Sequence, residues 1–234
     1  MLLLKIYLPV GKMLLTAFQH SIKRDFFTKI PDSVFMKTKT NFNSLTNNTR
    51  QRILERATGL FAEKGYAGTY VREIVEKAGV SKPALYYYFQ SKEGLFYAIL
   101  EWATQAQRDI LNEVLEASGT ALDRFIFLYR RIYEGIQEYQ SLYKMIHRLL
   151  YGPPQGAPPY DFSRFQADMF SAVKRIYLEG LAAGEVKKAD ADEIAFLVLS
   201  LIDFCLNSDN IAPEMADARR PERLLRLAFQ GLGA

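Results

Sequence analysis

A stretch that begins at Gly65 constrains the fold of this chain most, because helix boundaries are closely spaced along it. Gly65 and Gly79 each follow an apolar helical pattern, as glycines at helix C-termini do. Ser81 and Ser91 each precede a new pattern, as N-capping serines do. Pro83 falls in a first helical turn, where it removes no intrahelical hydrogen bond. Two short helices joined by a tight turn at Gly79 are therefore predicted.

The apolar periodicity places four helices in this region. The first begins at Thr49 and carries apolar residues at i, i+1, i+4, i+7 and i+8, counted from Ile53. A short second helix ends at Gly79, with Thr69 as its expected N-cap. The third spans about residues 82–89. The fourth follows Ser91 and runs toward Leu115 before Ser118 and Gly119 interrupt it.

The remainder of the chain is also helical in pattern. No segment shows sustained strand alternation, so the predicted fold class is all-α. Residues 152–159 read GPPQGAPP, and their prolines and glycines predict a non-helical connection. The further helical segments are expected at about 121–139, 141–150, 161–183, 190–208 and 213–232.

Charge divides the chain into three parts, although the net charge is only +4. Residues 1–45 carry 7 basic and 2 acidic side chains, residues 46–95 carry 8 and 5, and residues 96–234 carry 15 and 19. The first part lacks sustained periodicity and is expected to be a poorly ordered leader, with Met36 as an alternative start. The second is expected to be a small basic domain and the third a larger acidic one.

Few residues are available for metal binding or covalent chemistry. Cys205 is the single cysteine, and His20 and His147 lie far apart, which excludes an internal disulfide and a cysteine-based zinc site. No Gly-rich phosphate loop or Ser/His/Asp elbow is present, so we expect neither an enzyme nor a cofactor. Cys205 is either a redox sensor or a buried side chain.

The expected location is the cytoplasm. A single cysteine is typical of a reducing compartment. No apolar run approaches the roughly 20 residues that a membrane helix needs. Lys5, Pro9 and Lys12 interrupt the apolar opening of the chain, which argues against a signal peptide.

Two short helices around a glycine turn, flanked by amphipathic helices, predict a helix-turn-helix that reads DNA. Leu85 and Phe89 are four residues apart and face inward, so the other side chains of the third helix are left for a DNA duplex or for neighbouring helices. The tyrosines fit either place. The residues expected on the outer faces are Lys82, Pro83, Ala84, Tyr86, Tyr87 and Tyr88, and Ser81, Ser91 and Lys92 lie at helix starts that favour phosphate.

The run GYAGTYVREIVEKAGVSKPALYYYFQSKEGLFYAIL, residues 65–100, resembles the N-terminal domain of the tetracycline-repressor (TetR) family of transcription regulators. The resemblance covers about fifty residues from Thr49. It implies that Arg72 contacts a base edge or a phosphate and that Thr69 and Tyr70 contact the DNA backbone. It also implies that residues 82–84 read bases and that residues 86–88 and Lys92 contact phosphates. Val75 stands where the family commonly has alanine.

The same resemblance implies a homodimer that forms through the helices near 161–183 and 190–208. It also implies a small-molecule inducer that binds the larger domain and releases the protein from double-stranded operator DNA. The aromatic residues there suggest an apolar or aromatic ligand, although such residues also form ordinary helical cores. The expected pocket residues are Phe125, Tyr129, Tyr133, Tyr143, His147, Phe165, Phe170 and Asp203, with Arg148 as a further polar candidate.

The function that these features indicate is a ligand-responsive transcriptional repressor. The alternative is a helical scaffold that has the fold but does not read a specific operator.

Overall fold

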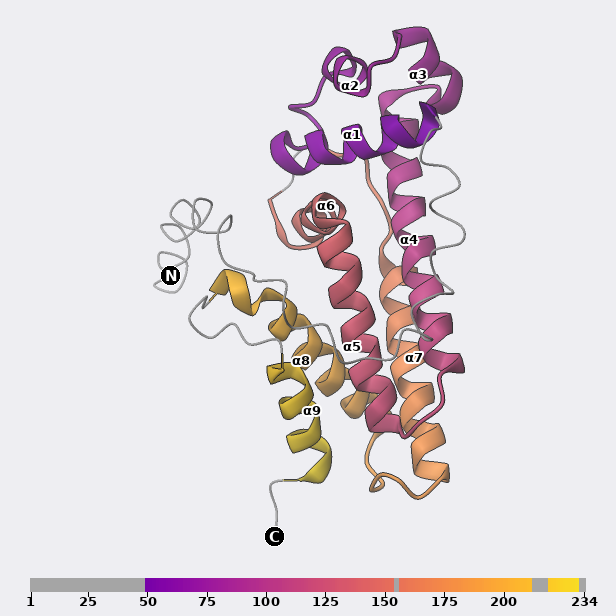
Figure 1. Ribbon diagram of the computed structural model, residues 1–234, viewed down its shortest axis with the longest axis vertical. Helices are drawn as coiled ribbons and strands as arrows, with labels where there is room; N and C mark the ends of the chain where they lie inside the picture. Colours follow the sequence, from indigo (N-terminus) through magenta and orange to yellow (C-terminus); the bar gives the residue numbers. More distant parts are fainter. Residues whose placement is uncertain (1–48, 154–155, 212–218, 232–234) are drawn as a thin grey trace, which may run out of the picture.

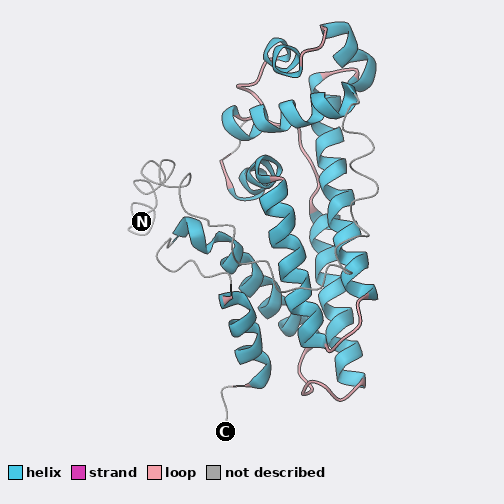
Figure 2. Ribbon diagram, in the orientation of Figure 1, coloured by secondary structure: helices cyan, strands magenta, loops and turns pink. Residues whose placement is uncertain are grey.

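The computed structural model describes residues 49–153, 156–211 and 219–231. Every regular element within these ranges is a helix, which confirms the all-α fold class (Figure 2). The predicted leader, residues 1–45, and Met36 lie outside the described residues. The helices are α1 (Thr49–Lys64), α2 (Val71–Ala78), α3 (Lys82–Phe89), α4 (Lys92–Glu116), α5 (Ala121–Glu138), α6 (Gln140–Tyr151), α7 (Ser163–Ala182), α8 (Ala191–Ile211) and α9 (Arg220–Gln230).

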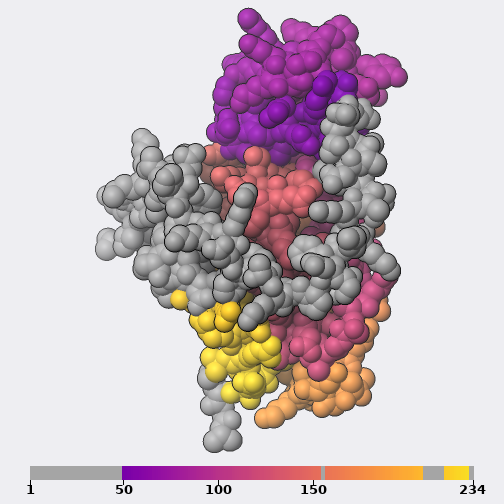
Figure 3. All heavy atoms as spheres, viewed as in Figure 1, coloured from indigo at the N-terminus to yellow at the C-terminus, as the bar shows by residue number. Residues whose placement is uncertain are grey.

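Helices α1, α2 and α3 form one end of the molecule, and the long helix α4 runs from this end toward the other (Figure 1). Figure 3 shows the same end as a lobe in indigo and purple. The core of the lobe combines α1–α4 with two residues of α6, Leu142 and Met145. Helix α6 therefore supports the lobe from below through α1.

A second core fills the other end of the molecule. It joins the C-terminal half of α4 to α5, α7, α8 and α9, with Phe125, Val173 and Ile176 among its fully buried side chains. Because α4 contributes to both cores, it crosses the predicted boundary at residues 95–96 without a break. The division into a DNA-binding and a larger domain stays a prediction.

The starts of α3 and α4 follow the predicted capping chemistry, whereas the start of α2 does not. The Ser81 and Ser91 hydroxyls accept hydrogen bonds from the amides of Ala84 (3.3 Å) and Gly94 (2.8 Å), as the sequence predicts. Helix α2, however, is capped at Tyr70 and not at Thr69. The Glu73 carboxylate accepts the Tyr70 amide proton at 3.1 Å, so a side chain within the helix caps its start.

The described part of the chain contains no helix that is both long and apolar enough to cross a bilayer.

Candidate DNA-binding site

The turn between α2 and α3 depends on a glycine. Gly79 has φ +62°, in the left-handed region, and its amide donates to the Glu76 carbonyl at 3.2 Å. The next amide, of Val80, donates to the Val75 carbonyl at 3.0 Å. These two bonds satisfy carbonyls that the end of α2 would otherwise leave unpaired. The predicted turn glycine is thus confirmed, and Val75 is buried beside it.

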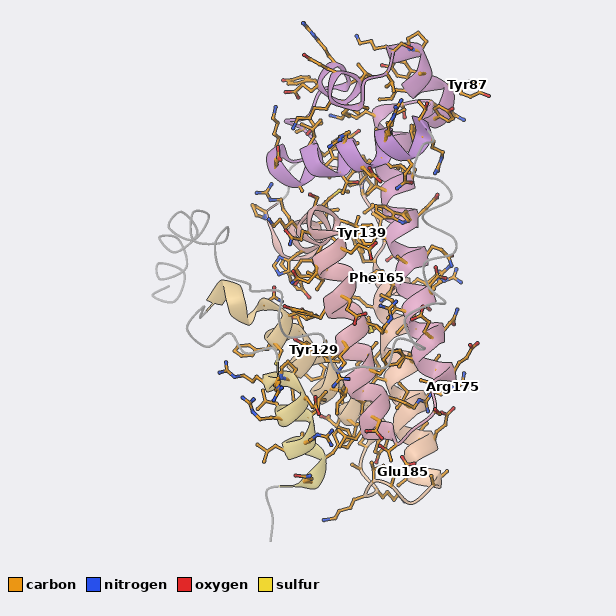
Figure 4. All side chains as sticks on the ribbon, viewed as in Figure 1. Tyr87, Tyr129, Tyr139, Phe165, Arg175 and Glu185 are labelled. Atoms are coloured by element: carbon orange, nitrogen blue, oxygen red, sulfur yellow. The ribbon has the colours of Figure 1, made fainter. Side chains whose placement is uncertain are left out.

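Helix α3 buries one face and exposes the others. Leu85 and Phe89 are buried in the lobe, whereas Lys82, Pro83 and the three tyrosines are exposed. Tyr87 is 81% exposed and projects away from the body of the molecule (Figure 4). The sequence left open whether Tyr87 is exposed or packs between helices, and the structure shows it exposed.

The end of α3 lies very close to the start of α4. A Cβ added to Gly94 would lie 2.2 Å from the Phe89 carbonyl oxygen. Between these residues Gln90 has φ +62° and is the non-glycine residue with positive φ in the described chain. The α3–α4 turn thus has a close approach at Gly94 and backbone strain at Gln90.

Helix α2 presents Arg72 to solvent, and Tyr70 is exposed just before it. Within the described residues neither Arg72 nor Lys82 forms an ion pair. The neighbouring Glu73 pairs with Lys64 of α1, and this pair and the Tyr70 amide lower the pKa of the Glu73 carboxyl. The charges that remain available for phosphate or base edges on α2 and α3 therefore include Arg72 and Lys82.

The predicted DNA contact of Thr69 could come only from its main chain, because the side chain is buried in this structure. The side chain is 0% exposed, and its hydroxyl donates to the carbonyls of Gly65 (2.8 Å) and Leu60 (3.2 Å). The Leu60 carbonyl lies in the last turns of α1 and the Gly65 carbonyl lies just after the helix. The Thr69 side chain therefore binds the end of α1 instead of capping α2.

Lys92 has a different environment from the predicted one. Its ammonium donates to the carbonyls of Tyr66 (2.8 Å) and Thr69 (2.9 Å) and lies 4.0 Å from the centre of the Tyr66 ring. Burial lowers the pKa of the Lys92 ammonium. In this structure Lys92, at the start of α4, is hydrogen-bonded to the α1–α2 turn. Tyr66 was not predicted from the sequence, because a single tyrosine after Gly65 carries no signal of this contact.

Residues 53–99 match the model of the TetR family of bacterial regulatory proteins, so the match covers the whole helix-turn-helix and its flanks. This segment is a TetR-family DNA-binding domain. The transcriptional repressor KstR2 of Mycobacterium tuberculosis is 32% identical over 99 residues, which are 41% of this chain and 48% of KstR2. The biofilm operon regulator IcaR of Staphylococcus aureus is 29% identical over 99 residues, 40% of this chain and 51% of IcaR. The chain thus matches about half the length of these relatives.

The likeness extends over most of the chain when structures are compared. The regulator FadR of Bacillus subtilis, solved in complex with stearoyl-CoA, has a TM-score of 0.64 with this chain. The two are 18% identical, and the alignment covers 78% of this chain and 99% of FadR. At this identity the comparison shows a shared fold, with a helix-turn-helix and a larger helical part.

The ligand-pocket residues predicted from TetR-family resemblance do not form one group. Phe125 and Tyr129 are buried in the second core, where Tyr129 stacks on Tyr133 at 5.9 Å between ring centres. Phe170 packs partly buried against the same core, and Phe165 packs against Phe162 with ring centres 6.2 Å apart. Figure 4 shows Tyr129 and Phe165 at separate places along the molecule.

Helices α6 and α8 bring together the other three predicted residues. The Tyr143 hydroxyl donates to the Asn207 side chain at 3.0 Å, and the Asn207 amide donates to the Asp203 carbonyl at 2.8 Å. His147 lies 5.8 Å from Tyr143 between ring centres. Burial, reinforced by Asp203, raises the pKa of Tyr143 to about 12. This group is a polar contact between two helices.

Gln107 on α4 was not singled out in the sequence. It is buried, and its amide donates to the Phe165 carbonyl at 3.0 Å. Its Oε1 is the buried side-chain atom that lacks a hydrogen-bond partner among the described residues. A lone glutamine in an amphipathic helix gives no sequence signal of such a place.

Cys205 is buried in the second core, and burial raises the pKa of its thiol. A raised pKa disfavours the thiolate that oxidation requires, so the buried interpretation fits the structure better than the redox sensor. Over the described ranges no three His, Cys, Asp or Glu side chains gather into a group that could hold a metal ion.

Proposed function

We propose that this protein is a transcriptional repressor that binds operator DNA as a homodimer and is released by a small apolar or aromatic ligand. The observation that carries the proposal is the α2–Gly79–α3 unit, which exposes Arg72, Lys82 and the α3 tyrosines at one end of the molecule. A helix placed in this way can enter a major groove. Two TetR-family relatives support repression and not activation, because KstR2 is described as a repressor and IcaR as a negative regulator.

We assign direct DNA contacts to a subset of the predicted residues. Lys82, Pro83 and Ala84 begin α3 and are proposed to read base edges, together with Arg72 of α2. The proposed phosphate contacts are the exposed side chains of Tyr70, Tyr86, Tyr87 and Tyr88 and the amides at the start of α3 behind Ser81.

The homodimer is proposed to form through one exposed apolar patch on α7 and α8. The patch consists of Leu178 on α7 and of Phe196, Leu197 and Phe204 on α8. Phe196 is 66% exposed and Phe204 58%, which is unusual for large apolar side chains on neighbouring helices. A second copy that covers this patch would set the two reading helices about 34–36 Å apart, the spacing of successive major grooves.

A ligand is proposed because another protein with the same fold binds one. FadR was solved with stearoyl-CoA. Release by a ligand requires that ligand and operator prefer different conformers of the protein. The proposed role is binding and not catalysis, and we place the protein in the cytoplasm, where bacterial operators are.

The test is a selection of genomic DNA fragments by the purified full chain at near-physiological salt, repeated with Lys82→Ala and Arg72→Ala. We expect a short palindromic motif that the variants lose or relax, with about 1–3 kcal/mol less discrimination at the contacted base. Salt-sensitive binding without any motif would support the alternative, a helical scaffold that does not read a specific operator.

A further inference from the structure

A cavity of about 360 Å³ lies below the DNA-reading lobe, between α1, α4, α6 and the connection from α6 to α7. We call it the junction cavity. Its volume falls within the range of about 300–1,000 Å³ that is typical of small-molecule sites. It includes none of the eight pocket residues predicted from the sequence. The side chains that line it include Phe61, Tyr66, Phe96, Met145, Leu149 and Tyr160, together with Arg148.

One wall of the junction cavity is a packed aromatic group from the lobe itself. The ring centres of Phe61 and Tyr66 are 5.6 Å apart, and that of Phe96 lies 5.7 Å from Phe61 and 5.1 Å from Tyr66. Phe61 and Phe96 are buried in the first core, so this wall cannot move without disturbing the lobe. Tyr66 is the partly exposed ring of this group, so an apolar ligand would contact Tyr66, and Phe61 and Phe96 would hold that ring in place.

The connection between α6 and α7 forms another part of the cavity lining and packs against the first core through Ala157, Tyr160 and Phe162. The Tyr97 hydroxyl donates to the Pro159 carbonyl at 3.2 Å, and the Tyr160 and Thr104 hydroxyls lie 3.1 Å apart. Pro158 and Pro159 fix their own backbone φ angles. These contacts attach the connection to α4 and fix this side of the cavity.

Arg148 is the charged residue among the described residues that line the junction cavity. One guanidinium N–H donates to the Ala62 carbonyl at 3.1 Å. A guanidinium has five such donors in a planar arrangement that suits a carboxylate. An apolar cavity with a single cation at its edge is complementary to an apolar molecule with one negative charge.

We propose that the junction cavity binds a small aromatic or aliphatic carboxylate, with the apolar body against Tyr66, Leu149 and Tyr160 and the carboxylate at Arg148. The ligand would touch the α1–α2 turn through Tyr66, whose carbonyl accepts a hydrogen bond from Lys92. Because this turn leads directly into α2, occupation of the cavity would change the preferred placement of the reading helices. This regulatory consequence rests on the proposed function, whereas ligand binding in the cavity does not.

Calorimetry with the full chain tests the site, with 2-naphthoate as the probe and neutral 2-naphthamide as its uncharged counterpart. We expect Arg148→Gln to weaken 2-naphthoate binding by about ten-fold or more, since a hydrogen bond to a charged group is lost, and to leave 2-naphthamide unchanged. The control is Arg130→Gln, the same change at a half-exposed arginine that pairs with Glu222 outside the cavity. It should bind both probes like the parent protein.

A second variant tests the location independently of charge. Ala157 lines the cavity from the connection, and Ala157→Phe would occupy part of its volume and abolish binding of both probes. Thermal unfolding of each variant shows whether it folds; if Ala157→Phe does not, Arg148→Gln with its control decides. Absence of 2-naphthoate binding up to about 1 mM, or equal binding by the parent and folded variants, would overturn the site.

The regulatory consequence has its own readout. Once an operator has been selected, 2-naphthoate should weaken its binding by about five-fold or more, and Arg148→Gln should remove this effect. Binding in the cavity without any change in operator affinity would overturn the coupling and leave the site in place. If no operator is found, the proposed function fails, and the calorimetry still decides whether the cavity binds the probe.

Discussion

Lys92 shows how a residue in a DNA-binding motif can serve the motif's own structure. Its ammonium donates to two carbonyls of the α1–α2 turn and lies over the Tyr66 ring. Burial lowers its pKa, which is a sign that the charge is partly removed from water. Lys92 thus adds a polar contact between the α1–α2 turn and α4 to the packing of the first core.

We expect Lys92→Met to lower the free energy of unfolding by about 1–3 kcal/mol, because two carbonyls lose a charged donor. It should weaken specific and non-specific DNA binding alike and leave the salt dependence of binding unchanged. Urea denaturation and DNA titrations at several salt concentrations measure the two effects. The control is Lys77→Met, at an exposed lysine 3.7 Å from Glu63, which should cost less than about 1 kcal/mol.

The opposite outcome has a distinct signature. If Lys92 binds a phosphate, its loss should reduce the slope of log affinity against log salt by about one, with little change in stability.

Gln90 offers a second prediction for a single residue. It ends α3 with φ +62° and ψ −35°, a conformation that favours glycine. Gln90→Gly should raise the free energy of unfolding by up to about 1 kcal/mol, and Gln90→Ala should not, because alanine keeps the Cβ that is strained here. Thermal and urea unfolding would contradict this if Gln90→Gly proved less stable than Gln90→Ala.

Arg124 of α5 joins three helices at the end of the molecule away from the reading lobe. Its guanidinium donates to the carbonyls of Val114 (3.2 Å) and Leu115 (3.0 Å) at the end of α4, and to Glu179 of α7 at 2.6 Å. The Arg124 side chain is buried, whereas Glu179 is largely exposed. The contacts to the helix end should therefore matter more than the ion pair.

Arg124→Leu should lower the free energy of unfolding by about 2–3 kcal/mol at neutral pH, because two carbonyls at the end of α4 lose their donor. Arg130→Leu, which breaks a half-exposed pair with Glu222, should cost less than about 1 kcal/mol. Urea denaturation of both variants and the parent protein gives the comparison. Equal costs for the two would contradict the assigned role of the buried guanidinium.

Lowering the pH should reveal the smaller contribution that the Arg124–Glu179 ion pair makes to the free energy of unfolding. Arg124 first, and then Arg175, lower the pKa of the Glu179 carboxyl below its ordinary value of 4.5. A lowered folded-state pKa means that this stabilisation is present above the unfolded pKa and is lost as the pH falls through the folded value. The difference in stability between parent and Arg124→Leu should therefore narrow below about pH 4.5 and not widen.

On the scale of the whole molecule, two surfaces expose side chains that suit different partners. The lobe formed by α1–α3 exposes tyrosines and basic residues, whereas α7 and α8 expose the apolar patch defined above. Helix α4 runs between the two ends and contributes to both cores (Figure 1). A dimer formed through the patch would therefore fix the separation of the two lobes.

We expect the double variant Phe196→Glu, Phe204→Glu to be a monomer that has lost affinity for a palindromic operator, because charge on both faces of a symmetric interface opposes association. Sedimentation velocity measures the oligomeric state. The control is Tyr87→Glu, at an exposed aromatic outside the patch, which should remain a dimer. A double variant that sediments like the parent protein would exclude this patch as the interface.

The sequence alone determined the features that depend on neighbouring residues. Gly79 needs only its own φ to make the turn, and Ser81 and Ser91 cap helices whose amides lie three residues away. The spacing of Leu85 and Phe89 was enough to orient α3. For the same reason the family resemblance, which is a dense local pattern, agreed with the match of residues 53–99.

Only the tertiary structure decided the features that join distant parts of the chain. Thr69 turned inward because the end of α1 offers it a carbonyl nine residues away, and Lys92 reaches carbonyls 23 and 26 residues before it. The junction cavity combines residues from Phe61 to Phe162. Helical periodicity shows which face of a helix is apolar but not which neighbour covers it, because that neighbour is chosen by the packing of the whole chain.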